Sequence, residues 1–315
     1  MKFVIMSPPY DEQNGGSIVL HKLCDLISRA GHEASIFPLF QNGEINPLDW
    51  PGSIQSCIVE RLGLENTFGN RETFRLCERY QTKLFDADVY QIPKDDDFIV
   101  VYPEIVFGNP LGAKNVARWI LHNPGFHTGK VYYTIGEVQF AFNDLFKPLA
   151  VPYMEVAPFH LSIFDIPWGL YHDDGSNSSR ERRGTAYLVK KGHGRAAVHD
   201  LENSVCIDGL GHEEVAAIFK SVEMFISYDQ ASFYSHLAAL AGCASVIVPD
   251  TASSTRPGDA AAYGRNGIAY GFEDIQRAID TVPQMIVELQ EQERESVRSV
   301  DRFLQFWSSR LSRST

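Results

Sequence analysis

The sequence has no long uninterrupted run of apolar residues. A helix that crosses a bilayer needs about 20 mostly apolar residues, and no stretch of the chain approaches that length. Lys2 leads directly into the short apolar segment Phe3–Met6, without the charged and apolar regions of a secretory signal. We therefore expect neither a membrane-spanning helix nor a signal peptide, and a cytoplasmic protein that at most binds peripherally at the inner membrane face.

The chain also has little cysteine. The five cysteines are scattered, odd in number and never spaced as C-x-x-C: Cys24, Cys57, Cys77, Cys206 and Cys243. This pattern argues against a disulfide framework and against a structural zinc site. The adjacent pair Asp173–Asp174 lies in the turn-rich segment Tyr171–Gly184, which predicts a solvated surface loop. We therefore expect no metal site.

Positive charge is scarce relative to negative charge. The 40 acidic residues exceed the 28 basic ones and give a net charge of -12, which disfavours a general nucleic-acid or anionic-membrane binder. The 315 residues, 44% of them hydrophobic, are enough for two domains with separate cores. We expect one domain over residues 1–165, a second over 166–285, and a last helix over 286–315 whose Phe303, Phe306 and Trp307 pack back on the first domain.

The most informative segment is Val222–Asp250. Two short apolar runs, Met224–Ser227 and Ser245–Val248, are typical of buried parallel strands, and a helical pattern lies between them. The polar loop Ser227–Ser232 then follows the carboxyl end of a strand, where open α/β sheets bind ligands. Ser232 is placed to cap the helix that follows. Taken alone, the segment equally fits an ordinary βαβ crossover with a capped helix.

A matching unit occupies the amino-terminal segment Met1–Pro38. The strand Phe3–Met6 leads into a polar loop, and Gly15 and Gly16 then open an amphipathic helix that ends near Gly31. Two glycines at a helix start let backbone N–H groups approach an anion or a sugar closely. The G-x-G-x-x-G dinucleotide spacing is absent, so a tight strand-to-helix turn is the alternative.

The segments between these two units predict further strands and helices. We expect strands in the following places: Asp97–Glu104, Val131–Thr134, Tyr153–Val156, Tyr187–Val189 and near Val205–Ile207. We expect helices over these ranges: Arg71–Phe85, Ala113–His122 with a stop at Asn123-Pro124-Gly125, Glu213–Lys220 and Pro283–Leu311.

Both ends of the chain resemble the GT-B glycosyltransferases. Gly15-Gly16, with a helix that ends in Gly31-His32-Glu33, is similar to the start of their acceptor domain, and Tyr187–Arg195 to the strand and basic loop that hold the donor diphosphate. The resemblance covers most of the chain. It implies an α/β fold of GT-B type, in which two Rossmann-like domains face each other across a cleft. It also implies a nucleotide-diphosphate sugar as the donor, a glycan or small molecule as the acceptor, and no further cofactor.

A finer resemblance points to the retaining GT4-like superfamily, whose E-x7-E motif ends five residues before a helix-terminal glycine. Counting back from Gly242 places Asp229 at the first carboxylate and Leu237 at the second, so the second is lost. In that family the second carboxylate binds the ribose, which puts this mode of ribose binding in doubt. Arg118–Gly125 and Phe225–Ser235 are also similar to segments of bacterial polysaccharide-cluster proteins.

The resemblance and the strand-end positions give three groups of candidate site residues. The donor and phosphate group is Lys190, Lys191, Gly192, Arg195, Tyr228, Ser232, Tyr234 and Ser235. The catalytic group is Asp229, Glu104 and His122, with His127 as a further residue able to reach substrate. The acceptor-side wall is Gly15, Gly16 and Ser17.

Each of these candidates has an ordinary structural alternative. The lysine-rich stretch is also typical of a solvated basic loop, and Asp229 of a helix cap. Phe233 favours core packing, and a single histidine is most often a surface or core residue. At the level of the whole chain, a sugar-nucleotide epimerase or hydrolase on the same fold, and a non-catalytic binding protein, remain alternatives to glycosyl transfer.

Overall fold

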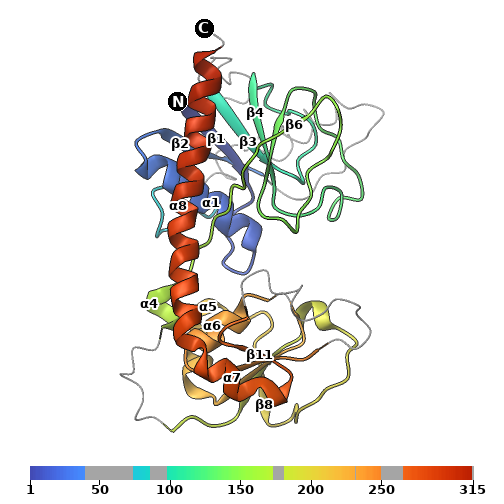
Figure 1. The fold of residues 1–315 in the computed structure, drawn as a ribbon, viewed down its shortest axis with the longest axis vertical. Coiled ribbons are helices and arrows are strands. Elements are labelled where there is room, and N and C mark those ends of the chain that lie inside the picture. Colours follow the sequence, from blue (N-terminus) through green and yellow to red (C-terminus); the bar gives the residue numbers. More distant parts are fainter. Residues whose placement is uncertain (40–73, 86–97, 173–180, 231, 250–264, 314–315) are drawn as a thin grey trace. The chain divides into compact units, whose positions relative to one another are not determined.

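The chain forms two compact units. A computed structural model describes residues 1–39, 74–85, 98–172, 181–230, 232–249 and 265–313 (Figure 1). Unit 1 consists of Met1–Asp165 together with Glu293–Thr315, and unit 2 consists of Ile166–Gln292. Each unit is described by itself below.

Unit 1 is built on a parallel sheet. Its six described strands are β1 (Lys2–Ser7), β2 (Glu33–Pro38), β3 (Phe98–Pro103), β4 (Asn115–Ile120), β5 (Val138–Ala141) and β6 (Glu155–Val156). Their order in the sheet is β2-β1-β3-β4-β5-β6, and each neighbouring pair is parallel. The second strand, β2, therefore lies on one side of β1, and all later strands, from β3 to β6, lie on the other side. This is the order of a Rossmann-like sheet.

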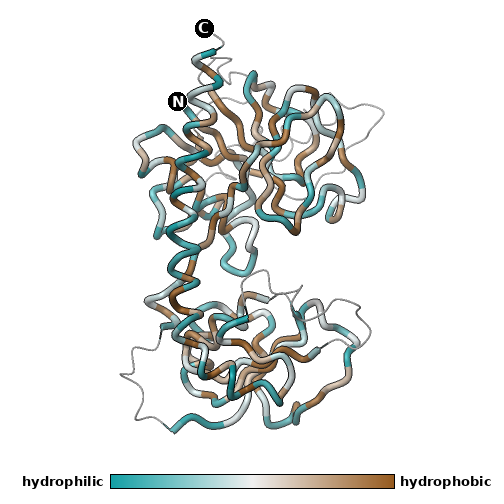
Figure 2. Tube along the Cα trace, in the orientation of Figure 1, coloured by the Kyte–Doolittle hydropathy of each residue, from teal (hydrophilic) through white to brown (hydrophobic). Residues whose placement is uncertain are grey.

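Alternation along the strands of unit 1 divides its core into two layers. Phe3 and Ile5 of β1 pack on one face, while Val4 and Met6 pack on the other, as expected for a period of two residues. The first face is covered by α1 (Gly15–Arg29) and by the second half of α8 (Val282–Ser312). Figure 2 shows brown, hydrophobic strands and an α8 that alternates between hydrophilic and hydrophobic residues.

The last helix contributes to the cores of both units. Met285 and Leu289, near its start, are buried in unit 2, whereas Phe303 and Trp307 are buried in unit 1. Phe306 is partly buried against the same unit 1 cluster and its ring lies 5.5 Å from that of Phe140. The apolar side chains expected on this helix therefore belong to the core of the first unit.

Unit 2 is a second Rossmann-like parallel sheet. Its five described strands are β7 (Thr185–Leu188), β8 (Ser204–Cys206), β9 (Met224–Ser227), β10 (Ala244–Ile247) and β11 (Ile268–Tyr270), in the order β11-β10-β9-β7-β8. Its helices are α4 (Trp168–Tyr171), α5 (His212–Ser221), α6 (Tyr234–Leu240) and α7 (Ile275–Asp280), with 3-10 turns η2 (Lys190–Gly192) and η3 (Phe272–Asp274). The two Rossmann-like α/β units expected from the sequence are thus confirmed.

Three sequence-based predictions in unit 1 were wrong. The segment predicted as a helix over Ala113–His122 is strand β4, with Val116, Trp119 and Ile120 buried inside the sheet. Residues 131–134 form no strand, and the next strand is β5. Of the possible helix over Arg71–Phe85, the described residues 74–85 contain turns and an isolated bridge between Leu84 and Ile36 instead.

The strand prediction at Tyr153–Val156 was correct only for its last two residues, which form the short edge strand β6. Most of the loop predicted over Tyr171–Gly184, including Asp173 and Asp174, lies outside the described residues. Among the helices that the structure describes, none combines the length and the apolar character needed to span a bilayer.

Candidate functional site

The carboxyl ends of β7 and β9 form the first candidate site. The two strands are parallel neighbours, and β8 and β10 flank them on opposite sides. The strand order therefore reverses between β7 and β9, and open α/β sheets bind their ligands outside the carboxyl ends at such a point. The loop after β7 carries Lys190 and Gly192, and the loop after β9 carries Tyr228 and Asp229. The basic loop after β7 and the polar loop after β9, which were predicted independently, are therefore adjacent.

The two loops touch at Gly192, which is buried. A Cβ atom at this position would lie 2.5 Å from the carbonyl oxygen of Tyr228 and 2.6 Å from its Cβ. Real Cβ atoms do not approach backbone this closely, so the contact requires glycine. The glycine therefore holds the turn after β7 directly against the backbone that follows β9.

The turn after β7 is anchored by a carboxylate from the neighbouring strand. Asp208, just beyond β8, accepts hydrogen bonds from the backbone N–H groups of Val189 (2.9 Å) and Lys190 (3.3 Å). Lys190 has a φ of 35° and is the one non-glycine residue with positive φ among those described. Such a conformation is costly for a residue with a Cβ, and strain of this kind is frequent at functional sites.

The ammonium group of Lys190 is oriented by an aromatic stack. Its Nζ atom lies 4.8 Å from the centre of the Tyr234 ring. That ring stacks on His212, with centroids 5.6 Å apart, and the hydroxyl of Tyr171 is 2.5 Å from His212 Nδ1. The lysine charge is therefore held at the edge of the sheet over the start of α6. For Lys191, the structure describes the backbone turn only.

Arg195 makes backbone contacts that the sequence did not predict. Its guanidinium donates to the carbonyl oxygens of Tyr228 (2.6 Å), Val248 (2.8 Å) and Pro249 (2.5 Å). It thus binds together the chain segments that follow β9 and β10, which keeps the carboxyl edge of the sheet in shape. A direct contact of Arg195 with phosphate stays a prediction.

The segment from Asp229 to Ser235 leads from β9 into α6. Asp229 is buried, and its carbonyl oxygen accepts hydrogen bonds from Ser227 Oγ (2.7 Å) and from the N–H of Ser232 (3.4 Å). Ser232 Oγ in turn accepts from the N–H of Tyr234 at 3.3 Å, while Phe233 occupies the cap position itself. The hydroxyl of Ser235 is buried without a hydrogen-bond partner among the described residues.

Leu237 stands where the resemblance expects the second carboxylate, and its side chain is buried in the core of unit 2. The side chain at this position therefore packs inside the unit and is not a ligand for ribose.

Two further contacts at this edge were missed by sequence reasoning. The Tyr228 hydroxyl accepts from the N–H of Val198 and lies 2.9 Å from His199 Nδ1. His212, which supports the Tyr234 ring, begins α5 directly after Gly209-Leu210-Gly211. In the sequence, glycines precede the helix that starts at His212, just as Gly15 and Gly16 open α1. The same pattern could therefore have identified His212.

Unit 1 has its own switch point between β1 and β3. The loop after β1 ends at Asn14, whose side chain caps α1 by accepting hydrogen bonds from the N–H groups of Gly16 (3.0 Å) and Ser17 (3.3 Å). Ser17 is buried, and its hydroxyl bonds the carbonyl oxygens of Asp11 and Asn14. A Cβ added to Gly15 would meet nothing within 4 Å. Gly15 is therefore the most open of the three residues expected at this wall.

Glu104 follows β3 and is 6% exposed. Burial raises the pKa of its carboxyl group to about 7, although the backbone N–H of Leu121 and the positive charge of Arg118 favour the ionised form. Its Oε2 accepts from the N–H of Leu121 at 3.2 Å. A carboxyl group with a pKa near neutrality is suited to accept a proton at physiological pH.

A buried arginine fixes the loop that carries Glu104. Arg118 on β4 pairs with Glu137 through contacts of 2.8 and 3.0 Å, and both side chains are at most 1% exposed. Its remaining donors reach the carbonyl oxygens of Pro103, Val106 and Gly108. Arg118 is thus a structural residue that determines the path of the chain just after β3.

His122 lies directly after β4, next to the backbone that binds Glu104. Its Nδ1 accepts from the N–H of Asn123 at 2.9 Å, and its ring contacts those of Phe126, His127 and Phe146. The structure therefore places two of the catalytic candidates, Glu104 and His122, just after the adjacent strands β3 and β4, at one carboxyl edge. Asp229, the third, belongs to unit 2.

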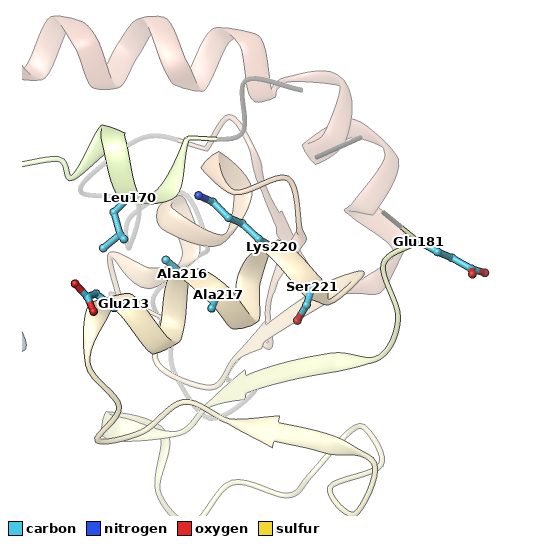
Figure 3. Close-up of a pocket in the computed structure, with 7 residues that line it drawn as sticks. All are labelled: Leu170, Glu181, Glu213, Ala216, Ala217, Lys220 and Ser221. Carbon is cyan, nitrogen blue, oxygen red and sulfur yellow. The ribbon is translucent and has the colours of Figure 1, made fainter. Parts of the chain in front are cut away.

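A surface hollow of about 520 Å³ lies elsewhere on unit 2. It is formed mainly by α5, with Ala216 and Ala217 beside Leu170 and with Lys220 at its border (Figure 3). None of the candidate residues lines it. The described residues also contain no group of three or more His, Cys, Asp and Glu side chains able to hold a metal ion. Metal independence stays a prediction.

Comparisons with known proteins give weak likenesses only. The chain matches no protein-family model and no curated protein. Its structure is similar to the spinosyn forosaminyltransferase SpnP, with 12% identity, 98% of this chain and 99% of that chain covered, and a TM-score of 0.39. It is similar to sucrose-phosphate synthase from Thermosynechococcus elongatus, with 7% identity, coverage of 99% and 100%, and a TM-score of 0.40.

LpCGTa, solved in complex with UDP, is similar with 10% identity, 99% of each chain covered and a TM-score of 0.40.

Proposed function

We propose that the protein is a glycosyltransferase that moves a sugar, of hexose or related type, from a nucleoside-diphosphate donor to a hydroxyl of a glycan or small acceptor. The observation that carries the proposal is the joined pair of loops after β7 and β9. A buried glycine brings one backbone turn against the other, and a strained lysine is held over the start of α6. A cation beside closely approaching backbone suits a diphosphate.

In this proposal, unit 2 binds the donor and unit 1 binds the acceptor. The bond between the anomeric carbon and the diphosphate oxygen breaks, and the electron pair leaves with the diphosphate. Lys190 stabilises that negative charge. Asp229, which is buried at the end of β9, is assigned to the sugar, where a carboxylate stabilises the positive charge that develops on the anomeric carbon or bonds the hydroxyls.

The acceptor oxygen forms the new bond to the anomeric carbon, and its proton passes to a base. Glu104 is assigned that role because its pKa of about 7 leaves a substantial ionised fraction at neutral pH. His122 follows the adjacent strand and is assigned a contact with the acceptor. The sequence resemblance further favours a retaining enzyme of bacterial polysaccharide biosynthesis in the cytoplasm.

Calorimetric titration with UDP, ADP, GDP and dTDP tests the donor assignment. We expect at least one of these nucleotides to bind, and the corresponding sugar nucleotide to transfer its sugar at the same rate in EDTA as in magnesium, because the protein's own cation stabilises the leaving group. Absence of binding by all four contradicts the proposal. Turnover of the donor without any acceptor identifies a hydrolase or epimerase instead.

A further inference from the structure

Asp208 lies where unit 2 leaves strand β8. The hydrogen bonding between β7 and β8 continues one residue past β8, because the N–H of Ile207 donates to the carbonyl oxygen of Tyr187 at 3.0 Å. Asp208 therefore lies alongside the residues that follow β7. Its carboxylate accepts hydrogen bonds from the N–H groups of Val189 and Lys190. The carboxylate thus connects the ends of two neighbouring strands.

The backbone that Asp208 binds has the geometry of an anion site. Val189 is in the right-handed helical region, with φ -103° and ψ -56°, and Lys190 is left-handed, with φ 35°. A right-handed residue followed by a left-handed one directs successive N–H groups toward one point and forms an anion-binding concavity. The Asp208 carboxylate occupies that point. The two N–H groups are therefore satisfied from within the protein, and an external phosphate must be bound by other groups.

The left-handed backbone at Lys190 has a steric cost that glycine would avoid. A residue with a Cβ keeps such a conformation only where its surroundings stabilise it, and such positions are frequent at functional sites. The two hydrogen bonds that Asp208 accepts stabilise it here. Among the described residues Lys190 makes no ion pair, and its Nζ atom lies over the Tyr234 ring. The carboxylate therefore binds the backbone of Lys190 and leaves its positive charge available to an anion.

We propose that Asp208 is the residue that positions Lys190 for the diphosphate of the donor. Its carboxylate fills the concavity after β7 and holds Lys190 in the left-handed conformation. The ammonium group is thereby directed to the Tyr234 side, where it stabilises the charge of the leaving group. This inference rests on the proposed function. It adds that the diphosphate contacts the side chain of Lys190 and not the N–H groups of Val189 and Lys190.

A double-mutant cycle of Asp208 and Lys190 tests this role by calorimetric titration with UDP, ADP, GDP and dTDP. For the nucleotides that the wild type binds, we expect Asp208→Ala to weaken binding about fivefold to thirtyfold, because the ammonium group is no longer held in place. Asp208→Asn keeps an oxygen acceptor and should weaken it only about twofold to fivefold. In the Lys190→Met background, Asp208→Ala should change the affinity by less than about twofold, because a positioning residue acts through the group that it positions.

Asp200→Ala is the matched control. Asp200 is an exposed carboxylate of the same unit that accepts from the N–H of Glu202 at 3.0 Å, within its own loop. Its replacement removes the same charge without changing the turn after β7, so we expect nucleotide affinity to stay within about twofold of the wild type.

Amide hydrogen exchange measured by NMR supplies a second readout that needs no nucleotide. Exchange at Val189 and Lys190 should become about tenfold faster or more in Asp208→Ala, because both N–H groups lose their acceptor. It should stay as in the wild type in Asp200→Ala.

Tighter nucleotide binding by Asp208→Ala would overturn the inference, since it would show that the vacated N–H groups receive the phosphate. Equal losses from Asp208→Ala in the wild-type and Lys190→Met backgrounds would also overturn it, because the carboxylate would then act on the loop as a whole. Unaltered exchange at Val189 and Lys190 has the same consequence. All three results leave the proposed function standing. Failure of all four nucleotides to bind the wild type contradicts the proposed function itself, and the inference falls with it.

Discussion

The carboxyl edges of the two sheets have the same topology and opposite chemistry. In unit 2 the edge between β7 and β9 presents the ammonium group of Lys190 and the close contact of Gly192 with the Tyr228 backbone. Arg195 donates hydrogen bonds to carbonyl oxygens at the same edge. In unit 1 the edge near β3 and β4 presents the buried carboxyl group of Glu104, the half-buried ring of His122 and the exposed ring of Phe126. The unit 2 edge therefore carries a cation, whereas the unit 1 edge carries a carboxyl group whose pKa is raised to about 7. The fold positions both sites, and the side chains decide what each binds.

The largest expected effect concerns the carboxyl group that distinguishes the unit 1 edge. Glu104→Gln keeps the size and the hydrogen bond from Leu121 but removes the base. We expect turnover to fall about 10²–10⁴-fold, the usual contribution of a general base. The wild-type rate should rise with pH through an apparent pKa of about 7, the value assigned to Glu104, and this limb should be absent from the variant.

Glu104→Gln should also change the pH dependence of the unfolding free energy. Because the folded-state pKa of Glu104 is raised, from 4.5 to about 7, the protonated form is the one that folding favours. Its stabilising contribution is complete below about pH 4.5 and is lost as pH rises through about 7. Urea unfolding should find Glu104→Gln more stable than the wild type at pH 8, by up to about 3 kcal/mol. An equal pH dependence of both proteins would contradict the burial argument.

A smaller effect is expected at the unit 2 edge from Gly192→Ala. The added Cβ would lie within 2.7 Å of the Tyr228 backbone, so the two loops must separate. We expect a loss of about 1–3 kcal/mol in unfolding free energy, together with weaker nucleoside-diphosphate binding in calorimetric titration. Unchanged nucleotide affinity in this variant would mean that the contact between the loops is structural only.

The smallest effect on stability is expected at the matching glycine of unit 1. A Cβ at Gly15 meets nothing within 4 Å, and the residue starts a helix. Gly15→Ala should therefore leave the unfolding free energy unchanged or raise it by up to about 1 kcal/mol. A loss of turnover in this stable variant, with nucleotide affinity intact, would show that substrate approaches Gly15. Normal turnover would remove Gly15 from the acceptor-side wall.

The sequence was sufficient to predict the two parallel sheets and the ends of β1, β3, β7 and β9, which carry most of the candidates. It was not sufficient for β4. Val116, Ala117, Trp119 and Ile120 fit helical spacing as well as a strand that is buried on both faces, and only the neighbouring strands β3 and β5 decide between the two.

The roles of the two buried or half-buried arginines were equally beyond the sequence. Arg118 is neutralised by Glu137, and Arg195 binds carbonyl oxygens from two strand ends. Both environments exist only after distant segments have packed, so a basic residue in the sequence does not by itself indicate an anion site. Lys190 keeps its predicted place because its position follows from a local turn after β7.

The assignment of the donor site to the β7–β9 edge is tested by calorimetric titration of two matched variants with a nucleoside diphosphate that the wild type binds. Lys190→Met removes a charge at the β7–β9 edge but keeps an unbranched side chain over Tyr234, whereas Lys220→Met removes one at the hollow on α5. We predict a loss of about 1.5–3 kcal/mol in binding for Lys190→Met, from one charge-assisted contact, and no change for Lys220→Met. Unchanged binding in Lys190→Met, or weakened binding in Lys220→Met alone, would contradict the assignment of the donor site.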